Sequence, residues 1–532
     1  MDGSGNPWFH ADIGIRGDRI VLVGDLAGAQ AKTTIDAGDR FVTPGFIDVH
    51  SHAAEGLVRP QLRQGQPLLA QGVTTIVTNP DGGGNVDLAA QRERLTNGGI
   101  GPNVALLIGH GSVRSAVMGA ANRAPATDEL EQMKALVRRG MAQGAFGLSS
   151  GLFYTPGSFA RTEEVIALAV VAGESGGLYT SHIRDEGDYN VGVVAAVQEV
   201  IRIAEEAHVT GIVSHMKALG PDSWGLSFAL TRRIEDARAR GAQVFADQYA
   251  YEASSTSLRA ALLPGGTALP AAGADAKRDE VEALVRENLR RRGGASAILI
   301  AFYKPDTSIE GKTLAAIASA RGTSAERAAL DLMARGGASI VSFNMSEQDI
   351  EQIMRQPYTM TSSDGGLVLP TEGRPHPRDY GAFARKLARY VRERKTVTLE
   401  SAIRSMTGLP ASVFGMKDRG AIREGAVADL AVFDPAAVRD RATYTDPHQL
   451  AEGMSYLLVN GVVVFDRGRF TAALPGKVLW QNPVAQPFRA ALGRADQPPP
   501  KATAVRRPAS AKGYGGPPKR CEGGSNAKAE NR

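Results

Sequence analysis

Cysteine is almost absent from this sequence of 532 residues. Cys521 is the only one, so no intramolecular disulfide can form and no thiolate is available inside the folded part of the chain. No apolar run reaches the roughly 18 residues that a membrane-spanning helix needs. No signal peptide is recognisable either. We therefore expect a cytoplasmic protein with no membrane span.

Excess charge is also scarce over most of the chain. The net charge is +5, but residues 481–532 hold ten Lys/Arg and three Asp/Glu, a net +7, which leaves about −2 for residues 1–480. This tail is rich in Pro, Gly and Ala, and its composition predicts disorder. A basic tail can touch nucleic acid or anionic surfaces, but no aromatic or helical pattern accompanies these charges. We expect a solvated extension and no nucleic-acid partner.

Length and pattern predict an α/β fold. The chain is too long for one compact core. Residues 44–407 alternate short apolar runs with amphipathic helices, which predicts a (β/α)8 TIM-like barrel. Residues 265–350 fit this pattern less well and predict an inserted helical region, either a mobile lid or a purely structural excursion. β-type segments in 1–43 and 408–480, with a tight hairpin at Asn460-Gly461, predict one small β-sandwich domain built from both terminal segments.

Histidine is sparse, and its placement is informative. Among the nine histidines, His50 and His52 come at the end of the apolar run that begins at Phe46. Side chains two positions apart on a strand point to the same side. Two imidazoles at a strand end supply two ligands of a catalytic metal, although a pair of surface histidines would show the same spacing.

Three further ligand-type residues end similar apolar runs. These runs are Gly177–His182, Val209–His215 and Tyr358–Asp364. Loop-like residues follow each of them. In a (β/α)8 barrel the carboxyl ends of the strands meet on one face, and catalytic residues come from the ends of different strands. We therefore expect these residues to form one site.

Seven motifs, in the right order from about residue 3 to about residue 478, resemble the N-acyl-D-amino-acid deacylases (D-aminoacylases) of the metal-dependent amidohydrolase superfamily. Each motif is weak alone, and together they are specific. The motifs are Pro44–His52, Gly147–Gly157, Ser181–Gly187, Ser214–Lys217, Ala253–Leu258, Ser363–Gly366 and Arg374–Arg378.

This resemblance implies a metal site and a general base. It implies zinc, as one or two ions, with His182 and His215 holding the tighter metal and His50 and His52 a second site; another divalent metal is an alternative. Metal-bound hydroxide would attack an amide carbonyl, and Asp364 would take the proton and pass it to the departing amine. Without the resemblance, Asp364 reads equally as a turn-forming aspartate before Gly365.

One position departs from the family pattern. The D-aminoacylases carry a metal-ligating cysteine after Gly-Val-Thr-Thr and an apolar run, and here Asp81 stands at that place. A carboxylate is a legitimate zinc ligand and shifts preference towards metals such as Mn or Co. The alternative is that residues 79–82, Asn-Pro-Asp-Gly, form only a turn. Metal number and identity therefore depend on Asp81.

Four residues are candidates for substrate binding. Lys217, two residues after His215, can face the site and pair with a substrate carboxylate, or it can face solvent. Arg378 is suited to bidentate carboxylate binding. We expect Tyr249 and Ser255 to line the pocket.

The sequence thus predicts an enzyme that hydrolyses the amide bond of small N-acyl-D-amino acids. A dipeptidase or a cyclic-amide hydrolase, similar to dihydroorotase or hydantoinase, is an alternative with the same metal chemistry. A non-catalytic relative with a degraded metal site is another. His110 is either near the barrel mouth or in a loop. No role is assigned to His10, His208 or His448.

Overall fold

The structure, a computed structural model of the chain, describes residues 1–269 and 275–481. All of the described residues belong to one compact unit. The tail predicted at 481–532 lies outside them, apart from Gln481. Within these two ranges, no helix combines the length and the apolar character required to cross a bilayer.

Eight parallel β runs form the centre of the molecule. They are β4 (Phe46–Asp48), β5 (Val73–Thr78), β6 and β7 (Asn103–Leu106 and Ile108–Gly109), β8 (Gly147–Gly151), β9 (Leu178–His182), β10 (Gly211–Val213), β11 (Val244–Gln248) and β15 (Thr359–Thr361). The strand order is β4-β5-β6 and then β7-β8-β9-β10-β11-β15. Only Leu107 separates β6 from β7, so these two strands continue one run.

The first and last of these runs meet and complete the ring. A parallel bridge joins Ser51 to Gly365. The amide of His52 donates to the carbonyl of Gly365 at 2.8 Å, and the amide of Asp364 donates to the carbonyl of His50 at 2.9 Å. The predicted (β/α)8 barrel is confirmed.

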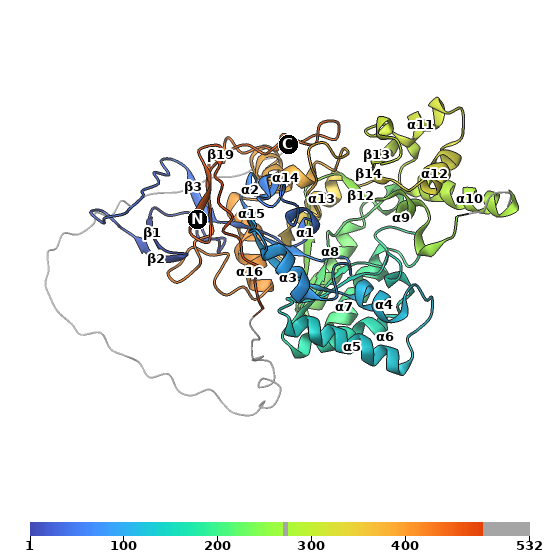
Figure 1. Cartoon of the computed structure of the whole chain (residues 1–532), viewed down its shortest axis with the longest axis horizontal. Helices are drawn as coiled ribbons and strands as arrows, with labels where there is room; N and C mark the ends of the chain where they lie inside the picture. Colours follow the sequence, from blue (N-terminus) through green and yellow to red (C-terminus); the bar gives the residue numbers. More distant parts are fainter. Residues whose placement is uncertain (270–274, 482–532) are drawn as a thin grey trace, which may run out of the picture. The chain divides into compact units, whose positions relative to one another are not determined.

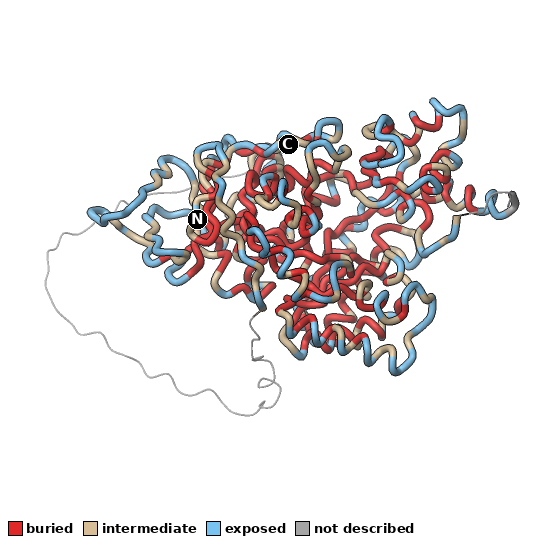
Figure 2. Tube along the Cα trace, in the orientation of Figure 1, coloured by how far each residue is buried: buried red, intermediate tan, exposed pale blue. Residues whose placement is uncertain are grey.

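Helices follow the strands and cover the barrel. They are α1 (Ala54–Leu57), α2 (Gln66–Leu69), α3 (Leu88–Thr96), α4 (His110–Met118), α5 (Thr127–Ala142), α6 (Thr162–Glu174), α7 (Val193–Ala207), α8 (Ser227–Ala239), α13 (Glu347–Met354), α14 (Arg378–Arg385), the π-helical η6 (Lys386–Glu393), α15 (Leu399–Met406) and α16 (Gly408–Val413). In α7 the buried side chains Val193, Val197, Val200 and Ala204 recur at helical spacing. Each large apolar side chain buried in this way stabilises the fold by about 1.5–3 kcal/mol. Figure 2 shows the buried residues concentrated in the middle of the molecule and the exposed ones towards its edge.

Both chain ends build a separate β structure. One antiparallel sheet has the order β19-β18-β17-β16-β3, and a hairpin pairs β1 with β2. The strands are β1 (Asp12–Arg16), β2 (Arg19–Gly24), β3 (Phe41–Pro44), β16 (Leu430–Phe433), β17 (Met454–Val459), β18 (Val462–Asp466) and β19 (Arg469–Phe470). Ile20 of the hairpin packs with Leu430 and Leu458 of the sheet, so the two layers share a small core. Figure 1 shows the blue N-terminal strands and the red C-terminal strand in the same part of the molecule.

The predicted hairpin is present between β17 and β18. Asn460 has φ 50° and Gly461 has φ 78°. Two consecutive residues with positive φ are typical of the type I′ turn, which matches the right-handed twist of the strands that it joins. The predicted β-sandwich is therefore assembled from both terminal segments.

An inserted subdomain lies between β11 and α13. Its antiparallel sheet has the order β12-β14-β13, and its helices form their own apolar cluster. The elements are β12 (Ala253–Ser257), α9 (Leu258–Leu262), α10 (Asp275–Arg291), β13 (Ile298–Phe302), α11 (Leu314–Ala320), α12 (Ala325–Ala334) and β14 (Ser339–Phe343). Figure 1 shows α9 to α12 gathered around these strands.

The insertion differs from the expected helical region in two respects. It begins at Ala253 and contains three strands, and α13 packs against α8 as a barrel helix. The hydroxyl-rich segment 253–257 has no apolar alternation and pairs with β14, more than 80 residues later in the chain. A local pattern does not reveal such a pairing, because the partner strand determines it.

Candidate active site

The six predicted metal-site residues meet at the carboxyl ends of the barrel strands. They come from five strands: His50 and His52 follow β4, Asp81 follows β5, His182 ends β9, His215 follows β10 and Asp364 follows β15. The barrel brings them together because parallel strands end on the same face.

Asp81 lies at the centre of this group. Its Oδ1 is 3.4 Å from His50 Nε2 and 3.5 Å from His215 Nε2. Its Oδ2 is 3.4 Å from His52 Nε2, and Oδ1 is 3.9 Å from His182 Nδ1. The carboxylate that replaces the family cysteine therefore faces all four histidines.

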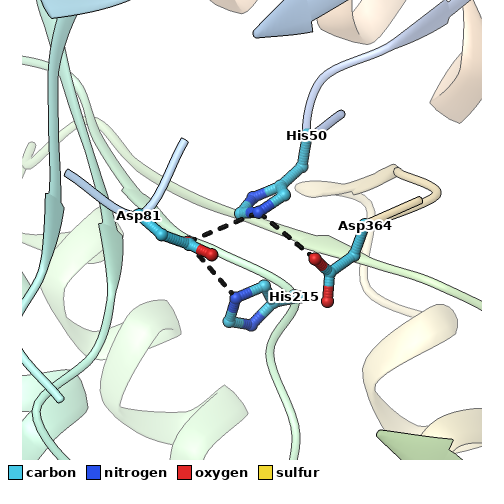
Figure 3. A group of neighbouring side chains, drawn as sticks. All are labelled: His50, Asp81, His215 and Asp364. Atoms are coloured by element: carbon cyan, nitrogen blue, oxygen red, sulfur yellow. Dashed lines mark ion pairs between the residues drawn. The ribbon is translucent and has the colours of Figure 1, made fainter. Parts of the chain in front are cut away.

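Asp364 closes the group from the other side. Its Oδ1 lies 3.5 Å from His50 Nε2 and 3.2 Å from His52 Nε2. Figure 3 shows Asp81 and Asp364 on either side of His50, with His215 turned towards Asp81. His182 Nδ1 and His215 Nε2 are 3.0 Å apart.

These separations fit a divalent cation. Two tetrahedral ligands at about 2.1 Å from zinc are about 3.4 Å apart, which agrees with the nitrogen-to-oxygen separations of the group. His50 Nε2 and Asp81 Oδ1 are buried and have no hydrogen-bond partner within the described part of the chain. Buried polar atoms are normally satisfied, and a divalent cation bound here would satisfy both. His50, Asp81, His215 and Asp364 form one candidate ligand group.

The electrostatics of the group also favour a cation. Burial opposes ionisation of Asp81, but His50 and His215 beside it hold the pKa of its carboxyl well below the ordinary value. Burial and Lys217 oppose protonation of His215, yet Asp364 and Glu186 raise its pKa to about 10. The carboxylates thus favour the protonated, positively charged form of His215, and a bound metal ion would displace that proton.

Three of the site residues have an unusual backbone conformation. Asp81, His215 and Asp364 have φ values of 55°, 34° and 49°. This left-handed region costs a non-glycine residue about 1–3 kcal/mol and persists only where the surroundings impose it. Here it turns each side chain inward directly after a strand.

Two buried aspartates hold the backbone of the ligand histidines. Asp48 Oδ1 accepts from the amide of His50 at 3.2 Å and from that of Ser363 at 2.9 Å. Asp247 Oδ1 accepts from the amide of His215 at 2.9 Å. Neither residue was predicted from the sequence. Asp48 could have been found, because a carboxylate inside an apolar run must satisfy its oxygens locally.

Glu186 was also missed, although it lies in a motif that carries the resemblance. Its Oε1 is 3.0 Å from His215 Nδ1, and it forms an ion pair with Lys217. If His215 donates its Nδ1 proton to Glu186, Nε2 keeps a lone pair directed at Asp81 and His182. The Lys217 ammonium lies 2.8 Å from the same Nδ1, so Glu186 favours the metal-binding tautomer of His215 where Glu186, and not Lys217, is the partner of Nδ1.

The predicted substrate residues line one cavity of about 720 Å³ beside the ligand group. The cavity contains Lys217, Tyr249, Ser255 and Arg378. Lys217 is only 5% exposed, and its ammonium already pairs with Glu186. It therefore does not face solvent, the alternative that the sequence left open.

Arg378 and Tyr249 are arranged to receive an anion. Arg378 Nη1 is 2.7 Å from Asp364 Oδ2, and its guanidinium lies 4.7 Å from the centroid of the Tyr249 ring. Arg378 Nε and the Tyr249 hydroxyl are buried without a hydrogen-bond partner among the described residues. A carboxylate in the cavity would satisfy both.

His376 positions Arg378. Its Nε2 contacts the carbonyl of Ala253 at 2.9 Å, and its Nδ1 accepts from the amide of Arg378 at 3.0 Å. Burial and the nearby Arg378 hold the pKa of His376 well below its ordinary value, so the ring stays neutral. This contact ties the first residue of β12 to the start of α14.

The remaining histidines lie outside the ligand group. His110 begins α4, and its Nε2 is 2.9 Å from Glu164, which also pairs with Arg114. This buried contact gives His110 a structural place beside the barrel mouth. His10, His208 and His448 are not part of the candidate metal groups or of the cavity lining.

Known proteins resemble the chain over most of its length. The model of the amidohydrolase family matches residues 33–465. The chain is 36% identical to a D-aminoacylase of Alcaligenes xylosoxydans xylosoxydans, with 90% of this chain and 95% of that protein covered. It is also 36% identical to an N-acyl-D-glutamate deacylase of the same organism, with 90% and 94% covered.

Solved structures agree. A D-aminoacylase studied for its binuclear metal centre superimposes with a TM-score of 0.78 at 34% identity, covering 90% of this chain and 98% of that one. An N-acyl-D-glutamate deacylase from Bordetella bronchiseptica, in complex with zinc and a phosphonate mimic of the tetrahedral intermediate, gives 0.78 at 36% identity, covering 90% and 97%. An L-hydantoinase from Arthrobacter aurescens, at 15% identity, has a TM-score of 0.55, covers 90% and 97%, and shares the fold.

Proposed function

The chain belongs to the amidohydrolase family, and we propose that it hydrolyses the amide bond of N-acyl-D-amino acids, giving a carboxylate and a free D-amino acid. It is a metal-dependent enzyme. The observation that carries this function is the convergence of four histidines and two aspartates at the barrel mouth, beside a cavity with anion-binding groups. The D-aminoacylases and N-acyl-D-glutamate deacylases that it resembles supply the substrate class.

The residues that would hold the metal are those of the ligand group. His182, His215 and Asp81 would hold one ion, and His50 and His52, with Asp81 shared and Asp364 adjacent, a second. A bound divalent cation supplies Lewis-acid chemistry, lowering the pKa of a water and polarising the amide carbonyl. We assign zinc, as one or two ions. The carboxylate of Asp81 makes Mn or Co a reasonable second choice.

Asp364 is the proposed general base and acid. Burial would raise the pKa of its carboxyl, but Arg378 and His215 lower it below the ordinary value, so the group is ionised at neutral pH. Arg378 contacts Oδ2, which leaves Oδ1 facing the histidines. Asp364 can take a proton from the attacking water and return it to the departing amine nitrogen, which cannot leave as an amide anion.

Arg378, Tyr249 and Ser255 are the proposed carboxylate-binding groups. The free hydrogen-bonding atoms of Arg378 and Tyr249 support this role. Lys217 adds positive charge between Glu186 and the Tyr249 ring, 5.5 Å from the ring centroid. Because its ammonium is already paired, we propose that it attracts the substrate anion without replacing Arg378 as the main contact.

The domain organisation follows the same logic. We take 1–43 with 408–480 as the small β domain and 44–407 as the barrel domain with its insertion. Ser254, Phe302 and Ser339 of the insertion line the cavity, which supports the role of a cover over the active site. The cytoplasmic location stays a prediction.

The direct test is amine release from N-acetyl-D-leucine and N-acetyl-L-leucine, with added zinc and then with a chelator. We expect turnover of the D form alone and its loss in chelator. Turnover of dipeptides or dihydroorotate in place of both would favour the alternative amidohydrolase activities. Absence of turnover together with absence of bound metal would contradict the enzymatic function.

A further inference from the structure

Arg292 is a buried cation without a counter-ion. It follows α10 directly, is 2% exposed and lines the same cavity as Asp364. Lys217 and Arg378 also line this cavity, and each has a carboxylate partner: Lys217 pairs with Glu186, and Arg378 with Asp364. Over residues 1–269 and 275–481, no carboxylate forms an ion pair with Arg292.

The groups that the Arg292 side chain contacts, Tyr189 and Asn344, are neutral. Its guanidinium lies 5.6 Å from the centroid of the Tyr189 ring. Arg292 Nη1 is 3.1 Å from the side-chain amide of Asn344. In the amide orientation that pairs donors with acceptors, the side-chain oxygen of Asn344 accepts a hydrogen bond from Arg292 Nη1. Arg292 Nε has no hydrogen-bond partner in the described part of the chain. A buried charge of this kind is unfavourable unless a ligand brings the opposite charge.

The cavity wall around Arg292 is polar. Hydroxyl groups dominate the part that the insertion contributes: Ser254, Ser255, Thr256, Ser257 and Ser339, alongside Ala301 and Phe302. Hydroxyls and a guanidinium are donors that suit a carboxylate, whereas a subsite for a leucine-like side chain would present mainly aliphatic groups.

Arg292 lies on the side of the cavity that holds the proposed carboxylate site. The backbone carbonyl of Asn344, the residue that contacts Arg292, accepts a hydrogen bond from the amide of Gly220. Gly220 comes three residues after Lys217. Arg378 and Tyr249 also belong to this side, since they follow β15 and β11, and β11 lies between β15 and β10 in the barrel. The charge of Arg292 therefore faces the amino-acid part of the substrate.

We infer that Arg292 binds the side-chain carboxylate of the substrate, and that this enzyme prefers N-acyl derivatives of acidic D-amino acids, D-glutamate or D-aspartate. The inference rests on the proposed deacylase function and deepens it. Arg378 and Tyr249 hold the α-carboxylate, and Arg292 is the matching cation for the second carboxylate.

The test compares kcat/KM for N-acetyl-D-glutamate, N-acetyl-D-aspartate, N-acetyl-D-glutamine and N-acetyl-D-leucine in the zinc-loaded, full-length enzyme. The expected preference for glutamate over its neutral isostere glutamine is about 100-fold, as a charge-assisted, buried contact gives. Arg292→Gln should lower kcat/KM for N-acetyl-D-glutamate about 100-fold, mainly through KM, and leave N-acetyl-D-glutamine within about threefold.

Two variants control this experiment. Arg290→Gln removes the same charge two residues earlier, in the last turn of α10, but Arg290 is exposed and pairs with Asp222 and Glu287, so the preference should be unchanged. Arg292→Lys keeps the charge and loses the planar fork, so it should retain part of the preference. Thermal melting of each variant checks that it is folded.

The outcomes separate this inference from the function on which it rests. Turnover of N-acetyl-D-leucine with no preference for acidic substrates would overturn the role of Arg292 and leave the deacylase function standing. An equal loss for glutamate and glutamine in Arg292→Gln would show a structural role. A loss of kcat/KM in Arg292→Gln that is selective for N-succinyl-D-leucine, whose second carboxylate is on the acyl group, would show that Arg292 binds the acyl group. It would overturn the inference for the amino-acid side chain. No turnover of any N-acyl-D-amino acid with metal bound would overturn both.

Discussion

The ligand group at the barrel mouth and the wall that the insertion adds to the cavity are built in opposite ways. The ligand group takes residues from five strands, and buried carboxylates such as Asp48 and Asp247 fix its backbone. The insertion is one continuous segment with its own apolar core, and it presents hydroxyls and Arg292. We therefore propose that the barrel supplies the chemistry and that the insertion supplies substrate selection. Substitutions in the two regions should consequently have different effects.

The largest expected effect is on the barrel side. Asp364→Asn keeps the size of the side chain but removes the proton acceptor. We expect kcat to fall about 10²–10⁴-fold, the usual contribution of a general acid–base. Metal content, measured by elemental analysis, should stay close to that of the unsubstituted enzyme, because four histidines and Asp81 remain. Asp306→Asn, on the exposed surface of the insertion, is the matched control. Near-normal turnover of Asp364→Asn would remove its assigned role.

A second effect concerns the central carboxylate. Asp81→Ala removes a group that faces all four histidines, and we expect metal affinity to fall by more than about 100-fold, beyond the loss typical of an outer-shell partner. Asp81→Cys restores the thiolate of the family pattern and should retain metal, with a preference shifted from Mn towards Zn. Competition dialysis with both metals measures this. Full metal content in Asp81→Ala would show that residues 79–82 form only a turn.

Glu186→Gln tests how the ligand group is supported. A neutral amide oxygen accepts a hydrogen bond from the Nδ1–H of His215 less strongly than a carboxylate does. His215 is therefore less restricted to the metal-binding tautomer. We expect zinc affinity to fall about 10–100-fold and turnover to recover when zinc is raised. Rescue by zinc separates positioning from misfolding. Lost activity that zinc does not restore, in a folded variant, would argue against this role.

The smallest expected effect on turnover comes from a buried lysine below the site. Lys386 donates to Thr361 at 2.8 Å and to Ser405 at 2.9 Å, and burial lowers its pKa to about 7 from the ordinary 10.5. The unfolded chain therefore binds more protons between about pH 7 and 10.5. Stability should rise with pH across this window, with the full cost of charging Lys386 present below pH 7.

Lys386→Met removes this cost. Thr361 and Ser405 still bond to one another at 3.0 Å, so no buried hydroxyl loses its last partner. We expect the free energy of unfolding at pH 6 to rise by about 1–3 kcal/mol and its dependence on pH to flatten between 7 and 10. Denaturant melts at both ends of this range measure it. A variant less stable at pH 6 would contradict the expectation. Substrate preference should not change.

The ligand residues were predictable because each ends a local apolar run and the barrel brings strand ends together. His182, His215 and Asp364 needed no knowledge of distant contacts. Asp81 was ambiguous, since Asn-Pro-Asp-Gly suits a turn, and the structure shows that the turn itself directs the carboxylate inward with φ 55°. A turn and a ligand are therefore compatible at this position.

Other features depend on contacts that a local pattern does not contain. Glu186 acts through the path of the loop after β9, which places it beside His215 and Lys217. The start of the insertion depends on the pairing of β12 with β14. Arg292 belongs to an Arg-rich helical segment whose residues look alike in sequence, and only burial and the absence of an ion pair among the described residues distinguish it.

The central claim is that the ligand group holds a divalent metal and that this metal is required for D-selective deacylase activity. The most direct measurement adds zinc stepwise to metal-free enzyme and follows bound zinc and hydrolysis of N-acetyl-D- and N-acetyl-L-amino acids together. The account predicts that turnover of the D substrate rises from zero with the first bound zinc, while the L substrate stays unhydrolysed. Turnover of the D substrate by the metal-free enzyme would contradict it.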